Sequence, residues 1–371
     1  MEPVRPAYGA RSLERIIPAI LGGPDAGHDT SWLPESVRSA SIVVVLVLDG
    51  LGWSVVDGRR AELPTLGAME GGPVTTVVPS TTASALTSLT TGLAPAEHGI
   101  VGYRMRVDDD ILNVLRWQTG SRRKPPDPFT VQRHSAFLGR AVPVVTRSEF
   151  RSTGFTDAHL RGCEFHGWST VSMLVEQCRV LVREGHRFVY LYYPGVDTVA
   201  HEYGITHPFF TAELRFVDDL AARLLDVLPQ EAALVLTADH GQVDVADRWR
   251  SLAPLEPLTR ACAGEGRFRY LYAERGAAAE LAEAARDLFG HEAWVLTREA
   301  LVDEGWLGAR PPGSNARRRI GDVVLAAREP VAYVDPALPR ESHLVAAHGS
   351  LTPDEMLVPL VAARGGATRD R

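Results

Sequence analysis

Ile42-Val43-Val44-Val45-Leu46-Val47-Leu48, followed by Asp49-Gly50, is the stretch that decides the fold class. An uninterrupted apolar run rich in β-branched residues is typical of a strand that is buried on both faces, as in a parallel sheet. Two similar runs occur later in the chain, at Phe188–Tyr193 and at residues 233–237. This recurrence predicts several strands of one buried, parallel sheet.

Helical patterns separate the apolar runs, most clearly at residues 81–90 and 212–228. Strands that alternate with helices predict an α/β fold, in which a mostly parallel sheet is flanked by helices. A further amphipathic helix is expected at residues 12–21, within an N-terminal arm.

Two segments interrupt this alternation. Residues from about 104 to 165 are rich in Arg, Asp and Pro and have weak periodicity, which predicts a lid insertion over one end of the sheet. A later segment combines two strand patterns with an Ala-rich helix pattern, which predicts a small inserted α+β subdomain of βαβ type. The expected division is an N-terminal arm at residues 1–40, a metal-binding α/β core at 41–261, the small subdomain at 262–312 and a return to the core at 313–371.

The composition is that of an ordinary globular protein, with 45% hydrophobic and 23% charged residues among 371. The net charge is −7 and the basic residues are scattered, so nucleic-acid binding, which needs a concentrated basic face, is not expected. Three cysteines without a C-x-x-C spacing predict neither a disulfide framework nor a cysteine-based metal site. The apolar runs are too short to cross a bilayer. We expect a soluble, cytoplasmic protein that does not associate with membranes.

Three acidic residues follow the predicted strands. Asp49 ends the first apolar run, Asp197 comes shortly after the second, and Asp239 comes shortly after the third. Ligands of open parallel sheets bind beyond the carboxyl ends of the strands. We therefore expect the three carboxylates to project into one crevice, although Asp is also a common turn residue.

Histidines accompany these acids. His201 lies four residues after Asp197, which places both on one face of a helix, and His240 directly follows Asp239. His348 lies in a further loop, just before a glycine. Three Asp and three His form a ligand set suited to two divalent cations; Zn²⁺ is favoured, and Mn²⁺ or Fe could occupy the same ligands.

A cluster of hydroxyl groups supplies candidate nucleophiles. Ser80, Thr81 and Thr82 lead into a helix of small residues, and the N-terminus of a helix suits a phosphate group. A hydroxyl at that position could attack phosphorus when a metal activates it. Each of the three could equally be a plain N-cap, and the spacing alone does not choose among them.

Together these segments resemble the alkaline phosphatase superfamily, and most closely its nucleotide pyrophosphatase/phosphodiesterase branch. The matching motifs are Val-Leu-Asp-Gly-Leu-Gly around Asp49, Pro-Ser-Thr-Thr ending at Thr82, Thr-Gly-Leu-Ala-Pro-Ala-Glu-His-Gly-Ile, Tyr-Tyr-Pro-Gly-Val-Asp-Thr-Val-Ala-His ending at His201, Thr-Ala-Asp-His-Gly at Asp239, and His-Gly-Ser at His348. They run in the family's order from residue 42 to about 360. The resemblance implies one zinc ion bound by Asp197, His201 and His348, a second bound by Asp49, Asp239 and His240, and a nucleophile, Thr82, that also contacts the second zinc.

Two positions depart from that branch. After the nucleophile the branch typically has Phe-Pro-Asn, whereas here Ala83-Ser84-Ala85 follows. The asparagine that holds a phosphate oxygen in the branch is replaced by Tyr103, whose hydroxyl could donate the same hydrogen bond or whose ring could line the leaving-group pocket. No Cys/Ser-x-Pro-x-Arg pattern lies near Thr82, which argues against a sulfatase.

The expected function is therefore that of a metal-dependent hydrolase of phosphoric esters, working through a covalent phospho- or nucleotidyl-threonine. A dianionic monoester would favour cationic groups in the lid, for which Arg104, Arg106 and Arg116 are candidates. A diester would favour aromatic side chains around its second substituent, such as Tyr103, Trp117 and Phe129. The resemblance favours diester or pyrophosphate substrates, such as nucleotides. The alternatives are a phosphomonoesterase, a phosphonate hydrolase, a non-catalytic metal-binding protein, and a metal-independent mutase or transferase.

Overall fold

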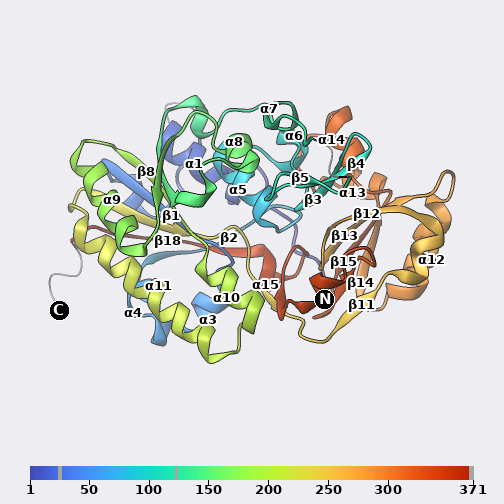
Figure 1. Ribbon diagram of the computed structural model, residues 1–371. Coiled ribbons are helices and arrows are strands. Elements are labelled where there is room, and N and C mark those ends of the chain that lie inside the picture. Colours follow the sequence, from blue (N-terminus) through green and yellow to red (C-terminus); the bar gives the residue numbers. More distant parts are fainter. Residues whose placement is uncertain (24–26, 122–123, 367–371) are drawn as a thin grey trace.

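A seven-stranded sheet forms the centre of the computed structural model, which describes residues 1–23, 27–121 and 124–366 (Figure 1). All of its strands are parallel except β18, which runs antiparallel to both of its neighbours. The predicted α/β class with a mostly parallel sheet is thus confirmed. The strand order is β2 (Glu70–Thr75), β18 (Leu357–Arg364), β9 (Ala232–Thr237), β1 (Ile42–Leu48), β8 (Phe188–Tyr193), β6 (Pro143–Arg147) and β7 (Glu164–Trp168).

Strand β1 lies in the middle of the sheet, as its sequence predicts. Val43 pairs in register with Phe188 of β8 and with Ala233 of β9. Every residue of β1 from Val43 to Leu48 is buried, because helices cover both faces of the sheet. This register places the carboxyl ends of β1, β8 and β9 side by side.

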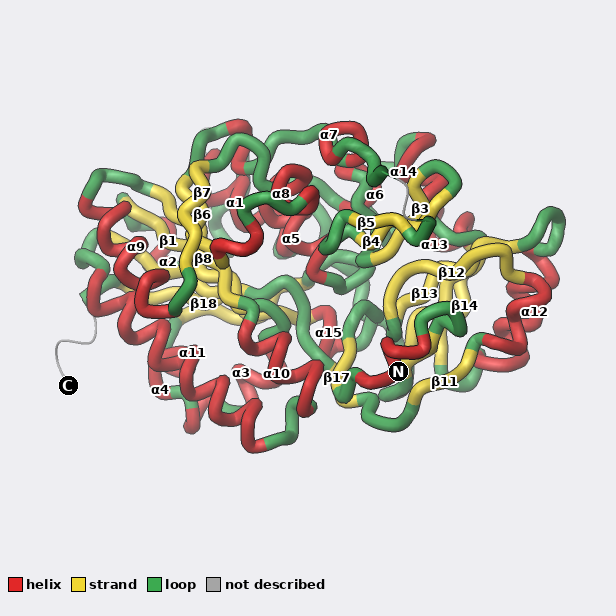
Figure 2. The backbone as a smooth tube through the Cα atoms, viewed as in Figure 1, coloured by secondary structure: helices red, strands yellow, loops and turns green. Residues whose placement is uncertain are grey.

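Two helical layers enclose the sheet (Figures 1 and 2). Helix α1 packs on α5 in one layer, and α11 packs on α4, α9 and α10 in the other. The first layer contains α1 (Leu13–Gly22), α5 (Thr82–Thr91) and α8 (Gly154–His159); the second contains α3 (Trp53–Gly58), α4 (Pro64–Ala68), α9 (Val171–Arg183), α10 (Gly195–Tyr203) and α11 (Pro208–Val227).

The expected lid is only partly separate from the core. It contains a three-stranded antiparallel sheet and the short helices on either side of it. The prediction extended the lid to residue 165, but Pro143–Arg147 is strand β6 of the central sheet. A five-residue strand is too short to give a clear periodic signal. The elements of the lid are α6 (Pro95–His98), β3 (Arg104–Val107), β4 (Asp110–Asn113), β5 (Gln118–Thr119) and α7 (Pro128–Val131).

A second, small sheet forms the other end of the molecule, at the right of Figures 1 and 2. It has four strands, and all of its pairings are antiparallel, whereas a βαβ unit would be parallel. One of its strands, β15, lies in the segment that was predicted to return to the core. Local sequence does not show which distant strands pair, so this membership could not be predicted. Its elements are β12 (Thr259–Glu265), β13 (Phe268–Ala273), α12 (Ala278–Phe289), β14 (Ala293–Thr297), α13 (Arg298–Asp303), α14 (Ser314–Arg319) and β15 (Val323–Ala327).

The small sheet is fastened to the core by a buried ion pair. Arg267, at the turn between β12 and β13, donates two hydrogen bonds of 2.8 and 2.9 Å to Glu355 in the short helix α15 (Pro353–Met356). Both side chains are fully buried. The short connecting elements are α2 (Glu35–Arg38), β10 (Val243–Asp244), β11 (Trp249–Ser251), β16 (Ala332–Val334) and β17 (Ala346–Ala347).

The N-terminal arm, apart from residues 24–26, lies within the described chain, and its first residues reach the α13 region. Arg5 forms an ion pair of 2.7 Å with Glu304, and its guanidinium lies 4.1 Å from the ring of Trp306. The predicted return segment is described as far as residue 366. Among the described residues, no helix combines the length and the apolar character that crossing a membrane would need.

Candidate active site

The three predicted carboxylates meet at the carboxyl edge of the central sheet. Asp49 directly follows β1, Asp239 lies just beyond β9, and Asp197 is in the first turn of α10, which follows β8. The backbone N–H of Asp197 donates to the carbonyl of Asp49 at 3.0 Å, which holds the two loops together. Gly50 adopts φ +76°, and a Cβ there would lie 3.0 Å from Asp197, so this close approach requires glycine.

The three predicted histidines all face this edge in the same way. Nδ1 of His201 lies 2.8 Å from the carbonyl of Ala346, and Nδ1 of His348 lies 3.0 Å from the carbonyl of Ser80. Nδ1 of His240 lies 3.1 Å from the carbonyl of its neighbour, Gly241. A carbonyl only accepts, so each Nδ1 carries a hydrogen, and in the neutral imidazole Nε2 then has the lone pair that a metal ion would bind. This arrangement is typical of metal-binding histidines.

The six side chains form two overlapping groups. Nε2 of His240 lies 3.4 Å from a carboxylate oxygen of Asp49 and 3.4 Å from one of Asp239. Oδ1 of Asp197 lies 3.2 Å from Nε2 of His201 and 3.8 Å from Nε2 of His348. The donor atoms of Asp49, Asp239 and His240 all lie within 4.8 Å of one another, as do those of Asp197, His240 and His348.

Among the described residues, neither Arg nor Lys pairs with the carboxylates of the first group. Burial, reinforced by the neighbouring Asp239 and Asp197, raises the pKa of Asp49 well above its usual value. Oδ1 of Asp49 and Oδ2 of Asp239 are buried, and neither has a hydrogen-bond partner among the described residues. Two buried carboxylate oxygens without partners are costly unless a cation neutralises them.

The second group has more internal compensation. Burial opposes ionisation of Asp197, but the neighbouring His201 outweighs it and lowers the pKa of this carboxyl well below its usual value. Burial likewise opposes protonation of His201, and Asp197 reverses this and raises the imidazole pKa to about 9. Oxygen and nitrogen donors of these kinds fit divalent metal ions. Their spacing brings Asp49, Asp239 and His240 together in one group and Asp197, His240 and His348 in another, with Nε2 of His201 3.2 Å from Asp197.

Thr82 is the hydroxyl that faces the two groups. It is the first residue of α5, and its Oγ1 lies 3.1 Å from Nε2 of His240. The neighbouring hydroxyls have other partners: Ser80 donates to the carbonyl of Ser350, and Thr81 is hydrogen-bonded to Glu265. The geometry therefore separates the three hydroxyls that the sequence left equivalent.

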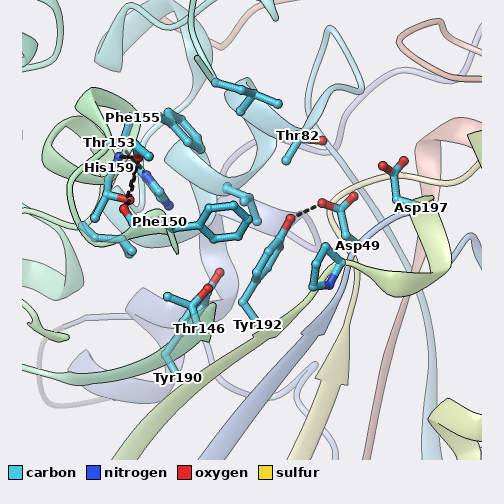
Figure 3. Close-up of a pocket in the computed structure, with 15 residues that line it drawn as sticks. Asp49, Thr82, Thr146, Phe150, Thr153, Phe155, His159, Tyr190, Tyr192 and Asp197 are labelled. Carbon is cyan, nitrogen blue, oxygen red and sulfur yellow. Dashed lines mark hydrogen bonds between the residues drawn. The ribbon is translucent and has the colours of Figure 1, made fainter. Parts of the chain in front are cut away.

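An apolar cavity of about 180 Å³ opens beside Thr82, between β8, α5 and α8 (Figure 3). The rings of Phe150, Phe155 and Tyr192 line it, and His159 stacks on Phe155 with ring centroids 4.0 Å apart. The hydroxyl of Tyr192 donates to Asp49, as Figure 3 shows, and so connects the wall of the cavity to the carboxylate.

A second cavity, of about 300 Å³, lies on the other side of Thr82 and Asp197. Tyr103 lines it, as do His201 and His348. The amide of Asn113 donates to the Tyr103 hydroxyl at 2.7 Å, which leaves the hydroxyl hydrogen free to point elsewhere.

The candidate arginines of the lid are not among the residues that line the two cavities. Arg104 forms an ion pair of 3.0 Å with Asp335, and Arg106 interacts with Asp109 at 3.4 Å. Arg116 is exposed. Arg104 also lies 3.9 Å from Glu341, which lines the second cavity, so its charge is shared between two carboxylates.

Of the three aromatic candidates, Tyr103 lines the second cavity, whereas Trp117 and Phe129 line neither cavity. Trp117 is buried and donates to the carbonyl of Pro126, and the exposed Phe129 lies 4.2 Å from the guanidinium of Arg161. No sequence pattern indicated Phe150, which lies in an irregular segment. Tyr192 could have been found, because it lies near the end of a predicted strand, at the edge where the acids were expected.

Comparisons with known proteins identify the family of this chain. The family model described as type I phosphodiesterase / nucleotide pyrophosphatase matches residues 43–351. The curated proteins include no match to this sequence.

Solved structures show the same fold. Murine ectonucleotide pyrophosphatase/phosphodiesterase 5 is 14% identical, covers 86% of this chain and 87% of its own, and superposes with a TM-score of 0.69. An inactive variant of the murine protein in complex with AMP is 14% identical, with 87% of each chain covered and a TM-score of 0.68. The human protein is 16% identical, covers 86% of this chain and 87% of its own, and has a TM-score of 0.66. The family model spans most of the chain, and the solved structures share its fold. The protein therefore belongs to the type I phosphodiesterase/nucleotide pyrophosphatase family of phosphoric ester hydrolases, within the alkaline phosphatase superfamily.

Proposed function

We propose that this protein hydrolyses phosphodiesters at a two-metal site, with Thr82 as the nucleophile and zinc as the metal. The observation that carries the proposal is the convergence of three Asp and three His around the Thr82 hydroxyl, 3.1 Å from His240. The buried, unpartnered oxygens of Asp49 and Asp239 support a cation at that point. When bound, two metal ions would stabilise the charge on the attacking and leaving oxygens and lower the pKa of a water molecule.

The chain itself positions the reacting groups. Thr82 begins a helix, so that free backbone N–H groups and the helix dipole face the phosphoryl oxygens. In the first step the Thr82 oxygen bonds to phosphorus, the bond to the leaving oxygen breaks, and the alcohol departs. In the second step water cleaves the phosphoryl–threonine bond and restores the hydroxyl. Carbonyl groups fix the histidine rings, and Tyr192 fixes Asp49, so little reorganisation is needed.

The linings of the two cavities favour a diester over a monoester. A dianionic monoester would need cationic groups around its free oxygens. Among the described residues, neither Arg nor Lys lines either cavity at Thr82. The apolar cavity beside Phe150 and Phe155 suits the second substituent that only a diester carries. One murine structural neighbour binds AMP and is inactive when a threonine is replaced by alanine, which supports a nucleotide-type ester and a threonine nucleophile.

The substitution Thr82→Ala tests the proposal. Turnover should fall by at least about 10³-fold, because the covalent step is lost. Elemental analysis of the same protein should still find two metal ions, which also identifies the metal. Thr87→Ala is the matched control: it removes another buried hydroxyl of α5, one that donates to the carbonyl of Ala83.

The substrates are bis-p-nitrophenyl phosphate, p-nitrophenyl phosphate and a p-nitrophenyl phosphonate ester. Faster turnover of the diester supports the proposal, whereas faster turnover of the other two would assign the site to a phosphomonoesterase or a phosphonate hydrolase. Full activity of Thr82→Ala would reject the nucleophile. A metal-loaded protein that is inert towards every ester would be a non-catalytic metal-binding protein.

A further inference from the structure

The second cavity differs in chemistry from the apolar one. Its lining includes Glu265 and Glu341 as well as Asp197, together with the aromatic side chains of Tyr103 and Trp249. Glu341 is already paired with Arg269. Glu265 has no ion-pair partner other than the imidazole of His348, at 3.7 Å, among the described side chains.

Glu265 reaches the site from the small sheet. It is the last residue of β12, and its side chain is 14% exposed. Thr81, which precedes the nucleophile, is hydrogen-bonded to it. Its Oε1 is buried without a hydrogen-bond partner in the described chain. Gly349, with φ +118°, makes room for the carboxylate, since a Cβ there would lie 2.8 Å from Oε1.

The geometry of displacement assigns this cavity to the leaving group. Thr82 lies against His240, in the group formed with Asp49 and Asp239. In an in-line displacement the leaving oxygen departs opposite the attacking one. Since Thr82 contacts the first group, we expect the leaving oxygen on the side of His201 and His348, and both of these histidines line the second cavity.

From this arrangement we infer that Glu265 selects the leaving group. The substrate is a diester whose departing alcohol is neutral or carries an ammonium group. It is not a nucleoside triphosphate or a dinucleotide whose leaving group is a phosphate. This inference rests on the proposed function. Acidic and aromatic side chains line this cavity, and among the described residues neither Arg nor Lys does, so it offers oxygen acceptors to a hydroxyl or ammonium group and no cationic partner to a phosphate. The faces of Trp249 and Tyr103 also suit an ammonium group.

A binding experiment tests the inference without turnover. The metal-loaded Thr82→Ala protein is titrated calorimetrically with the 2-aminoethyl ester of AMP and with ATP, which share the retained group and differ in the leaving group. We expect the ester to bind at least about tenfold more tightly than ATP. The substitution Glu265→Gln in the same background should reduce this preference by about tenfold, which corresponds to about 1.4 kcal/mol.

The control is Glu256→Gln, an exposed glutamate that precedes β12 and should leave the preference unchanged. Metal content and thermal unfolding are measured on each variant, so that a loss of metal or of folding is recognised. Activity is then compared for the p-nitrophenyl ester of thymidine 5′-monophosphate and for thymidine triphosphate, with the Thr82 protein.

The outcomes separate the two proposals. The inference is overturned if ATP and the ester bind equally, or if Glu265→Gln does not alter the preference. In either case, turnover of the diester would leave the proposed function intact. Absence of turnover for every ester overturns the proposed function itself. A Glu265→Gln protein that loses its metal ions would place Glu265 among the residues that support the metal site, which also overturns the inference.

Discussion

The carboxyl edge of the central sheet and the small antiparallel sheet contribute to one site in different ways. The central sheet supplies Asp49 and Asp239 from positions immediately beyond two neighbouring strands, and parallel pairing alone brings them together. The small sheet supplies Glu265 from the end of β12, and this residue reaches the site only because the two sheets are docked. The difference indicates that the core carries the reaction, and we propose that the docked unit selects what leaves.

The largest expected effect concerns the central sheet. Asp239→Asn should lower activity by at least about 10³-fold, because a ligand of the proposed metal site is lost. In the presence of a chelator the same variant should be more stable than the parent, since it removes a buried carboxylate whose Oδ2 has no hydrogen-bond partner among the described residues. Metal stoichiometry and thermal unfolding measure both effects.

Asp287→Asn, which changes an exposed residue of α12, serves as the control for that variant and should alter neither quantity. An Asp239→Asn protein that retains two metal ions and full activity would show that the edge of the central sheet is not the reactive centre.

The next effect concerns the connection between the two regions. Arg267→Met should lower the free energy of unfolding by about 3–5 kcal/mol, because Glu355 would remain as a buried, unpaired charge. Replacing both partners with methionine should recover much of the loss. Urea denaturation measures the change.

Arg250→Met is the matched control, since its ion pair with Glu292 involves a side chain that is 40% exposed, and the expected cost is below about 1 kcal/mol. A similar cost for Arg267→Met and Arg250→Met would mean that the two sheets are held together by other contacts.

A smaller effect should separate the two cavities. Phe150→Ala should raise the KM for an aryl diester by about tenfold, because it removes apolar contact with the retained group. It should leave the discrimination between leaving groups unchanged. Steady-state kinetics on the ester panel measure both, with the exposed Phe129→Ala as a control. A change in leaving-group preference instead would contradict the assignment of the two cavities.

The last effect concerns His98, the final residue of α6, which is buried against Ser88 of α5. Burial, reinforced by His134 and Arg319, lowers the pKa of His98 from 6.5 to about 3. Between these two values the unfolded chain binds a proton that the folded chain does not, so stability should decrease as the pH falls below about 6.5.

His98→Gln should make this dependence less steep, and chemical denaturation at a series of pH values between 4 and 7 measures the slope. The exposed His343→Gln should not alter it. Equal slopes for all three proteins would mean that His98 is not buried in its neutral form.

Much of the core and the candidate site could be predicted from local sequence. The apolar run of β1 identified the sheet, and the spacing of Asp197 and His201 identified one face of α10. The limits of the lid could not be predicted, because β6 is five residues long and pairs with a strand far away in the chain. Phe150 and Glu265 could not be predicted, because neither lies in a motif and both reach the site only through packing.

The sequence by itself determined the parallel sheet and the acids that follow its strands, because both are consequences of local apolar patterning and of the common direction of neighbouring strands. Only the tertiary structure decided which hydroxyl faces the histidines, and which side chains line the two cavities on either side of it. These features depend on contacts between segments far apart in the chain, such as the 3.1 Å contact of Thr82 with His240, and no local pattern encodes such contacts.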